Sequence, residues 1–195
     1  MWRSKFESSN KVTEVDGCVD NNVIALKFAE YFNNCYVCNN PERAAEIEQD
    51  YASLRQTYSG FPMSSEFYFD TELVGNIISD LKRGRAPGLD GLSAEHLFYA
   101  HPSICVVLSK LFCLLLQHRY VPAGFRSNYI VPLPKSSGSR AKALKCDDFR
   151  GIAISCVISK VFEYCILKKF DAFLRSDDYQ LCFKKGIGCS HAIVS

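Results

Sequence analysis

The sequence has no apolar segment long enough to cross a bilayer, although 48% of its 195 residues are hydrophobic. The longest apolar run extends from Ile104 to Leu116, and Ser109 and Lys110 interrupt it. A membrane-spanning helix needs about 20 apolar residues, so this run is too short. The first residues also lack the apolar core of a secretory signal peptide. We therefore expect the run to form a buried helix and the chain to have no membrane partner.

The sequence is also poor in patterns that bind metals or cofactors. Its ten cysteines lack the regular spacing of a disulfide framework, which favours free thiols in a reducing, intracellular compartment, nuclear or cytoplasmic. Cys35 and Cys38 form the only C-x-x-C pair, and none of the four histidines completes a zinc-ligand spacing. The glycine-rich stretch from Arg83 to Gly91 lacks the G-K-[ST] of a P-loop. We expect no bound metal and no small-molecule cofactor.

The two halves of the chain differ in charge, although the formal net charge is only +2. Residues 1–80 hold 6 Lys and Arg against 13 Asp and Glu, whereas residues 81–195 hold 17 against 8. A basic second half favours a polyanionic partner. An unevenly charged soluble surface explains these counts equally well, so charge alone leaves the partner open.

Hydrophobic residues recur at helical spacing through most of the chain. Asp70 is a suitable N-cap for one such segment, which Gly84 ends. A more polar segment begins at Pro41, and we expect it to be a connector helix that packs on one side. Its apolar stripe consists of Ile47, Tyr51 and Leu54. The segments predicted to be helical are 23–36, 41–58, 71–82, 93–99 and 102–117.

One part of the chain has the alternation and the β-branched residues of strands. Residues 128–134 contain Pro132 and Pro134, which cannot donate to a β ladder, so we expect an edge strand there. Residues 149–154 are expected to form the returning strand of a hairpin, with a polar, basic tip between the two. The fold class is therefore predicted to be α+β, mostly helical with one antiparallel β-hairpin.

A long helix is expected to follow the hairpin. The period becomes helical from Ser155, and we expect this helix to fix the base of the hairpin and to end near Arg175. The predicted buried face of the helix contains Val161, Phe162, Cys165, Ile166 and Phe170.

Four blocks of the sequence carry a family resemblance. They read RGRAPGLDGLSAEHL (83–97), VPLPK (131–135), DDFRGIAIS (147–155) and QLCFKKGIGCSHAI (180–193). In this order they resemble the opening motifs of reverse transcriptases from LINE-type (non-LTR) retrotransposons. The resemblance implies a connector region over residues 1–69 and the N-terminal part of a reverse transcriptase domain, the truncated fingers of a right-hand polymerase, over residues 70–195.

The resemblance also implies what the fragment does. It would contribute template and incoming-nucleotide contacts to an RNA-directed DNA polymerase, whose partners are an RNA template, a DNA primer and a deoxynucleotide triphosphate. The family's catalytic aspartates lie in later motifs, so we expect none of these residues to be catalytic and the chain alone to be inactive. Mg²⁺ is expected in the parent enzyme and not in this chain.

Site residues follow from the same resemblance. Lys135 and Arg150 match the residues that contact the triphosphate, and a mobile ammonium and a planar guanidinium both suit phosphate oxygens. The residues that match the template-contacting blocks are Arg83, Arg85, Gly88, Lys184, Lys185 and Gly186. The chain departs from the family pattern at Gly151, where proline is common, and at Cys182, where glycine is usual.

Alternatives remain open at each of these positions. Lys135 and Arg150 also suit simple surface charges, and the glycine-rich stretch also suits a turn with glycines at positive φ. A solvated loop is as good an account of Arg140, Lys142 and Lys145 as a nucleic-acid contact. We do not interpret the pairs Asp147–Asp148 and Asp177–Asp178 as catalytic, because adjacent residues point in different directions. The alternative function is a non-enzymatic nucleic-acid-binding or interaction module.

Overall fold

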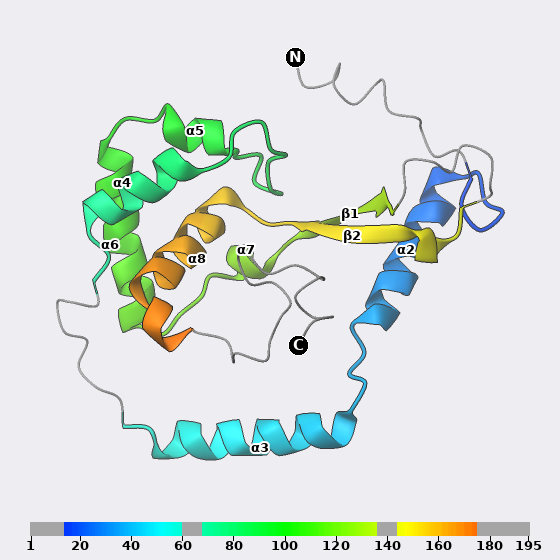
Figure 1. Ribbon diagram of the computed structural model, residues 1–195, viewed down its shortest axis with the longest axis horizontal. Coiled ribbons are helices and arrows are strands. Elements are labelled where there is room, and N and C mark those ends of the chain that lie inside the picture. Colours follow the sequence, from blue (N-terminus) through cyan, green and yellow to red (C-terminus); the bar gives the residue numbers. More distant parts are fainter. Residues whose placement is uncertain (1–13, 60–67, 136–143, 175–195) are drawn as a thin grey trace, which may run out of the picture. The chain divides into compact units, whose positions relative to one another are not determined.

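The computed structural model describes residues 14–59, 68–135 and 144–174 (Figure 1). These residues form seven α-helices and one two-stranded antiparallel sheet, which confirms the predicted α+β class. Within the described ranges, no helix has both the length and the apolar character needed to cross a membrane.

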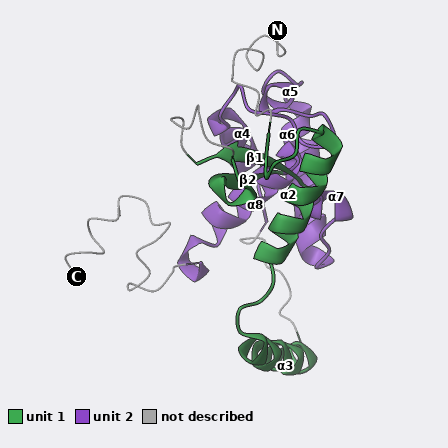
Figure 2. Ribbon diagram, turned by 90° about the vertical axis from the view of Figure 1, so that its right-hand side faces the viewer, with its two compact units in different colours: residues 1–62, 128–154 green, residues 63–127, 155–195 purple. Residues whose placement is uncertain are grey.

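The chain divides into two compact units, which Figure 2 shows in different colours. Unit 1 contains residues 1–62 and 128–154, and unit 2 contains residues 63–127 and 155–195. The hairpin therefore shares a unit with the N-terminal segment. The predicted boundary between residues 69 and 70 rests on the family resemblance and stays a prediction.

The sheet of unit 1 consists of β1 (Tyr129–Pro134) and β2 (Phe149–Ile154). Its register pairs Pro132 with Gly151 and Pro134 with Phe149. The Lys135 amide donates to the Asp148 carbonyl oxygen at 2.8 Å. Hydrogen-bonded and non-hydrogen-bonded pairs alternate along an antiparallel ladder, so Pro134 with Phe149 and Pro132 with Gly151 are both non-hydrogen-bonded pairs. Both prolines therefore occupy positions where a missing N–H costs no ladder bond, which explains how a strand with two prolines forms.

Helix α2 (Asn21–Cys35) covers one face of this sheet. It starts at Asp20, whose carboxylate accepts the amides of Asn22 and Val23. Phe28 and Phe32 are its buried residues, and the Phe28 ring meets the Phe149 ring edge-on at 4.8 Å. The side chains packed against the hairpin thus come from α2. The core of unit 1 consists of Val15, Phe28, Phe32, Cys146 and Phe149.

At Gly151, β2 passes close to α2. A Cβ atom at this position would lie 2.9 Å from Cε1 of Phe32 and 3.0 Å from Cγ2 of Ile130. The Phe32 ring therefore occupies the space that a side chain at this position would need. Glycine here serves packing.

Helix α3 (Pro41–Thr57) also belongs to unit 1, and it contains no buried residue. The Asn40 side chain caps it, and Pro41 occupies its first turn as predicted. Ile47, Tyr51 and Leu54 are 53%, 62% and 69% exposed, so the expectation that this stripe packs is wrong. Its three apolar side chains bury too little area to hold a helix by themselves.

Unit 2 is helical. Its elements are α4 (Thr71–Asp80), α5 (Ala94–Phe98), α6 (Ser103–Gln117), α7 (Ala123–Arg126), α8 (Val157–Lys169) and the 3₁₀ turn η3 (Asp171–Phe173). Helix α4 begins at the predicted cap, where the Asp70 carboxylate accepts the Leu73 amide at 2.6 Å. It packs against α6 and α8 (Figure 1), and the predicted stripe of α4 supplies Val74, Ile77 and Ile78 to the core.

Aromatic rings hold unit 2 together. Phe69 is 1% exposed, and its ring lies 6.4 Å from Phe112 and 6.1 Å from Phe162, edge-on in both cases. The buried hydroxyl of Ser109 in α6 donates to the Phe69 carbonyl oxygen at 2.6 Å. Of the face predicted for α8, Val161, Phe162 and Cys165 are buried, and Ile166 and Phe170 are partly buried against the same cluster.

Two expectations for unit 2 were wrong in detail. Helix α8 ends at Lys169 and not near Arg175, because a 3₁₀ turn follows it. Leu111 is 37% exposed although the pattern placed it in the core.

Candidate functional site

Lys135 and Arg150 lie at the loop end of the hairpin, beside the segment that connects its strands; this end is termed the hairpin root. Arg150 in β2 pairs directly with Leu133 in β1. Lys135 is the first residue after β1, and its amide donates to the Asp148 carbonyl oxygen, which continues the ladder beyond the strands. In this register the backbone of Lys135 is diagonal to that of Arg150. Both side chains are exposed.

A carboxylate lies beside the Lys135 ammonium. The Lys135 Nζ lies 3.5 Å from Oδ1 of Asp147, and the same oxygen accepts the Tyr31 hydroxyl at 2.9 Å. The hydrogen bond from Tyr31, followed by the charge of Lys135, lowers the pKa of Asp147. The same hydrogen bond is the main cause that raises the pKa of Tyr31 to about 12. At neutral pH Asp147 is therefore charged and Tyr31 keeps its proton.

The neighbouring Asp148 points elsewhere. Its Oδ2 accepts the Lys145 amide at 2.9 Å and caps the 3₁₀ turn η2 (Cys146–Asp148). The two adjacent carboxylates thus have separate structural tasks. In the described part of the chain, no group of three or more His, Cys, Asp or Glu side chains gathers in a way that fits a metal ion. The Mg²⁺ that the family resemblance implies for the parent enzyme finds no fitting residues there.

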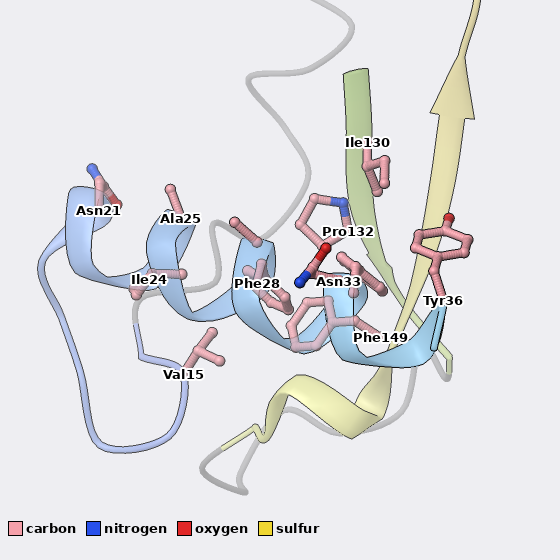
Figure 3. A pocket seen from close by; sticks show the side chains of 12 residues that line it. Val15, Asn21, Ile24, Ala25, Phe28, Asn33, Tyr36, Ile130, Pro132 and Phe149 are labelled. Carbon is pink, nitrogen blue, oxygen red and sulfur yellow. The ribbon is translucent and has the colours of Figure 1, made fainter. Parts of the chain in front are cut away.

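The face of the hairpin that α2 covers has a different character. Together with α2 it lines an open pocket of about 650 Å³, and Figure 3 shows Ile130 and Pro132 of β1 beside Asn33 and Tyr36 at the end of α2. None of the described residues that line it is charged, although Asn21, Asn33 and Tyr36 are polar. The pocket is therefore mostly apolar, and the charged residues of the hairpin root do not line it.

The glycine-rich loop belongs to unit 2 and is built by turns. Gly84 and Gly91 both have φ of +73°, where other residues are strained. The Gly84 amide donates to the Glu95 carboxylate, which is the largest cause of the lowered pKa of Glu95. A Cβ atom at Gly88 would lie 2.7 Å from Cα of Cys156. Close packing against the cap of α8 accounts for Gly88 without any ligand.

The two arginines of this loop differ in how they are held. The Arg83 guanidinium lies 4.6 Å from the centre of the Phe98 ring, a cation–π contact that orients it. Arg85 is exposed. Arg83 is exposed as well, so the loop presents two guanidinium groups to solvent. The role assigned to Arg83, Arg85 and Gly88 stays a prediction.

Several predicted residues lie outside the described ranges. They are Arg140 and Lys142 at the hairpin tip, Asp177 and Asp178, and the basic block with Lys184, Lys185 and Gly186.

The charge difference between the two halves of the sequence largely disappears when charges are counted for each compact unit. Unit 1 holds eleven Lys and Arg against eleven Asp and Glu, and unit 2 holds twelve against ten. The hairpin segment, residues 128–154, holds five basic residues against two acidic ones. Neither unit is basic as a whole, so any binding of polyanions depends on local groups such as the hairpin root.

Comparisons with known proteins give no identification: no family model matches the chain, and no curated protein matches it.

Proposed function

We propose that this chain is part of an RNA-directed DNA polymerase of the LINE-type retrotransposon kind and that the hairpin root binds the incoming triphosphate. The observation that supports the proposal is the strand register, in which Arg150 pairs with Leu133 and Lys135 follows two residues later, with both side chains exposed. The order of the four sequence blocks supports it. The template contact through Arg83, Arg85 and the block around Lys184 belongs to the same proposal.

The chemistry of the pair suits a triphosphate. The Arg150 guanidinium offers a planar fork that holds two oxygens of one phosphate, and the Lys135 ammonium adds a movable point charge. Leu133 lies directly opposite Arg150 and is 47% exposed, so apolar surface adjoins the cations. A nucleotide has both charged and apolar parts, and this face offers both. No step of the proposal depends on a bound metal.

Equilibrium binding of a deoxynucleoside triphosphate to the purified chain tests the proposal. Arg150→Ala should weaken binding about tenfold or more, because a hydrogen bond between charged groups contributes roughly 1.5–3 kcal/mol. Lys135→Ala should weaken it less. Arg126→Ala on α7 and Lys110→Ala on α6 remove exposed charges elsewhere and should change nothing.

The outcome also separates the two functions. Equal losses in the variants and their controls would mean that affinity follows net charge, which contradicts a site at the hairpin root. A chain that binds single-stranded RNA or DNA but no triphosphate would instead be the non-enzymatic nucleic-acid-binding module.

A further inference from the structure

We propose that Asp147 is the resting counter-ion of Lys135 and that Tyr31 holds it in place, so that a phosphate must exchange with this carboxylate to reach Lys135. The inference rests on the proposed function and adds two positioning residues to the same site. They come from different parts of the chain, since 116 positions separate Tyr31 from Asp147.

The two contacts of Asp147 are unequal. Its Oδ1 lies 2.9 Å from the Tyr31 hydroxyl but 3.5 Å from the Lys135 ammonium. Tyr31 belongs to α2, whose neighbouring Phe28 and Phe32 are buried, so its hydroxyl is mounted on a packed helix. Lys135 follows the end of β1, and its side chain is 47% exposed. The carboxylate therefore stays with Tyr31 when the ammonium moves.

The charge of the carboxylate opposes an incoming phosphate. Hydrogen bonding from Tyr31 and the charge of Lys135 keep Asp147 ionised. An exposed ion pair of this length is weak, so a triphosphate with several negative charges displaces Asp147 from the ammonium. The carboxylate remains nearby, however, and repels the ligand that replaced it. Asp147 thus lowers the affinity of the site for anions.

Asp147→Asn isolates this effect. The amide oxygen of asparagine still accepts the Tyr31 hydroxyl, but the negative charge is gone. We expect triphosphate affinity to rise about three- to tenfold, the range of an exposed charge interaction. Lys135→Ala in the same background should remove most of the gain. Unchanged or weaker binding by Asp147→Asn would overturn the proposal.

Asp80→Asn is the matched control, because Asp80 is an exposed carboxylate in unit 2 whose Oδ2 also lies 3.5 Å from a lysine ammonium, that of Lys168. Its triphosphate affinity should stay within about twofold of the wild type. If Asp80→Asn reproduced the gain of Asp147→Asn, then net charge would be the cause and the counter-ion role would be overturned.

Two nucleotide-free measurements separate this inference from the proposed function. In ¹³C-tyrosine-labelled protein, Asp147→Asn should return the midpoint of Tyr31 from about 12 towards its ordinary value. A Cys35→Ser background removes the nearby thiol that also faces Tyr31. The ¹⁵Nζ signal of Lys135 should shift in the same variant. If the Tyr31 midpoint and the Lys135 signal both change but no triphosphate binds, the proposed function fails and the counter-ion contact stands. If neither of the two changes, the counter-ion proposal fails.

Discussion

Gly151 shows at the scale of one residue how packing fixes the hairpin. Gly151→Ala should destabilise unit 1 by about 1–3 kcal/mol, because the new Cβ meets the Phe32 ring and Ile130 near 3 Å. This loss exceeds the ~0.4–1 kcal/mol that a glycine-to-alanine change gains by restricting the unfolded chain. Urea denaturation and hydrogen exchange of α2 and β2 measure the effect.

Gly75→Ala on α4 is the control for this substitution. Its Cβ would lie 3.8 Å from Cys105 Sγ, an ordinary contact, so helix propensity should stabilise unit 2 by roughly 0.5–1 kcal/mol. If the two variants behaved alike, the close approach of Phe32 to Gly151 would be wrong.

Tyr31 makes the stability of unit 1 depend on alkaline pH. Its folded-state pKa is raised to about 12, above the ordinary value of 10.0, so the unfolded chain loses this proton first. Stability is therefore complete below about pH 10 and is lost as the pH rises towards 12. Tyr31→Phe should flatten this part of the profile, which denaturant midpoints at pH 8 and pH 10.5 measure.

Another group titrates over part of the same range. Burial raises the pKa of the Cys146 thiol to about 11, so the wild type and Tyr31→Phe should both lose some stability between pH 9 and pH 11. The contribution of Tyr31 is the difference in stability between the wild type and Tyr31→Phe. Equal slopes above pH 10 would contradict the hydrogen bond to Asp147.

The sequence indicates Lys135 and Arg150 but not the residues that act on them. Both cations lie within recognisable blocks, and strand alternation places them once the register is known. Tyr31 belongs to a helix whose pattern shows only that one side is apolar. Nothing local relates it to Asp147, because their contact arises from the packing of α2 on the hairpin.

At the scale of an element, α8 derives its place from the aromatic cluster of unit 2. Phe162 is 6% exposed and its ring approaches Phe69, Phe112 and Phe125. Phe162→Ala should destabilise unit 2 by roughly 3–5 kcal/mol in thermal or denaturant melts. Phe173→Ala, the same change at a residue that is 78% exposed, should stay within about 0.5 kcal/mol of the wild type. Similar losses in both variants would refute the packing of α8.

Helix existence and helix packing were not equally predictable. The 3.6-residue spacing indicates where α2 and α4 run, and the cap Asp70 marks the start of α4, because these signals are local. Whether an apolar stripe is buried depends on what faces it. Both α3 and α4 carry apolar residues at helical spacing, although α3 is the more polar; α3 has no buried residue and α4 has three.

At the scale of the whole molecule, binding of nucleic acid should depend on local groups and on salt. Neither unit has a large net charge, so we expect weak affinity for single-stranded RNA that falls with salt and varies little with sequence. Arg83→Ala with Arg85→Ala should reduce the logarithmic salt slope by about 0.7 for each phosphate that the loop no longer neutralises. Arg126→Ala should leave the slope unchanged. If the double variant of Arg83 and Arg85 had the same salt slope as the wild type, the glycine-rich loop would be excluded as an RNA-binding element.

The central claim is that Lys135 and Arg150 act on one ligand. Titrating the ¹⁵N-labelled chain with a deoxynucleoside triphosphate tests it most directly, with the Lys135 Nζ and Arg150 Nε signals assigned through Lys135→Ala and Arg150→Ala. We predict that both signals move together, saturate at one ligand per chain and give one dissociation constant. Movement of one signal alone, or two different dissociation constants, would contradict a shared phosphate site.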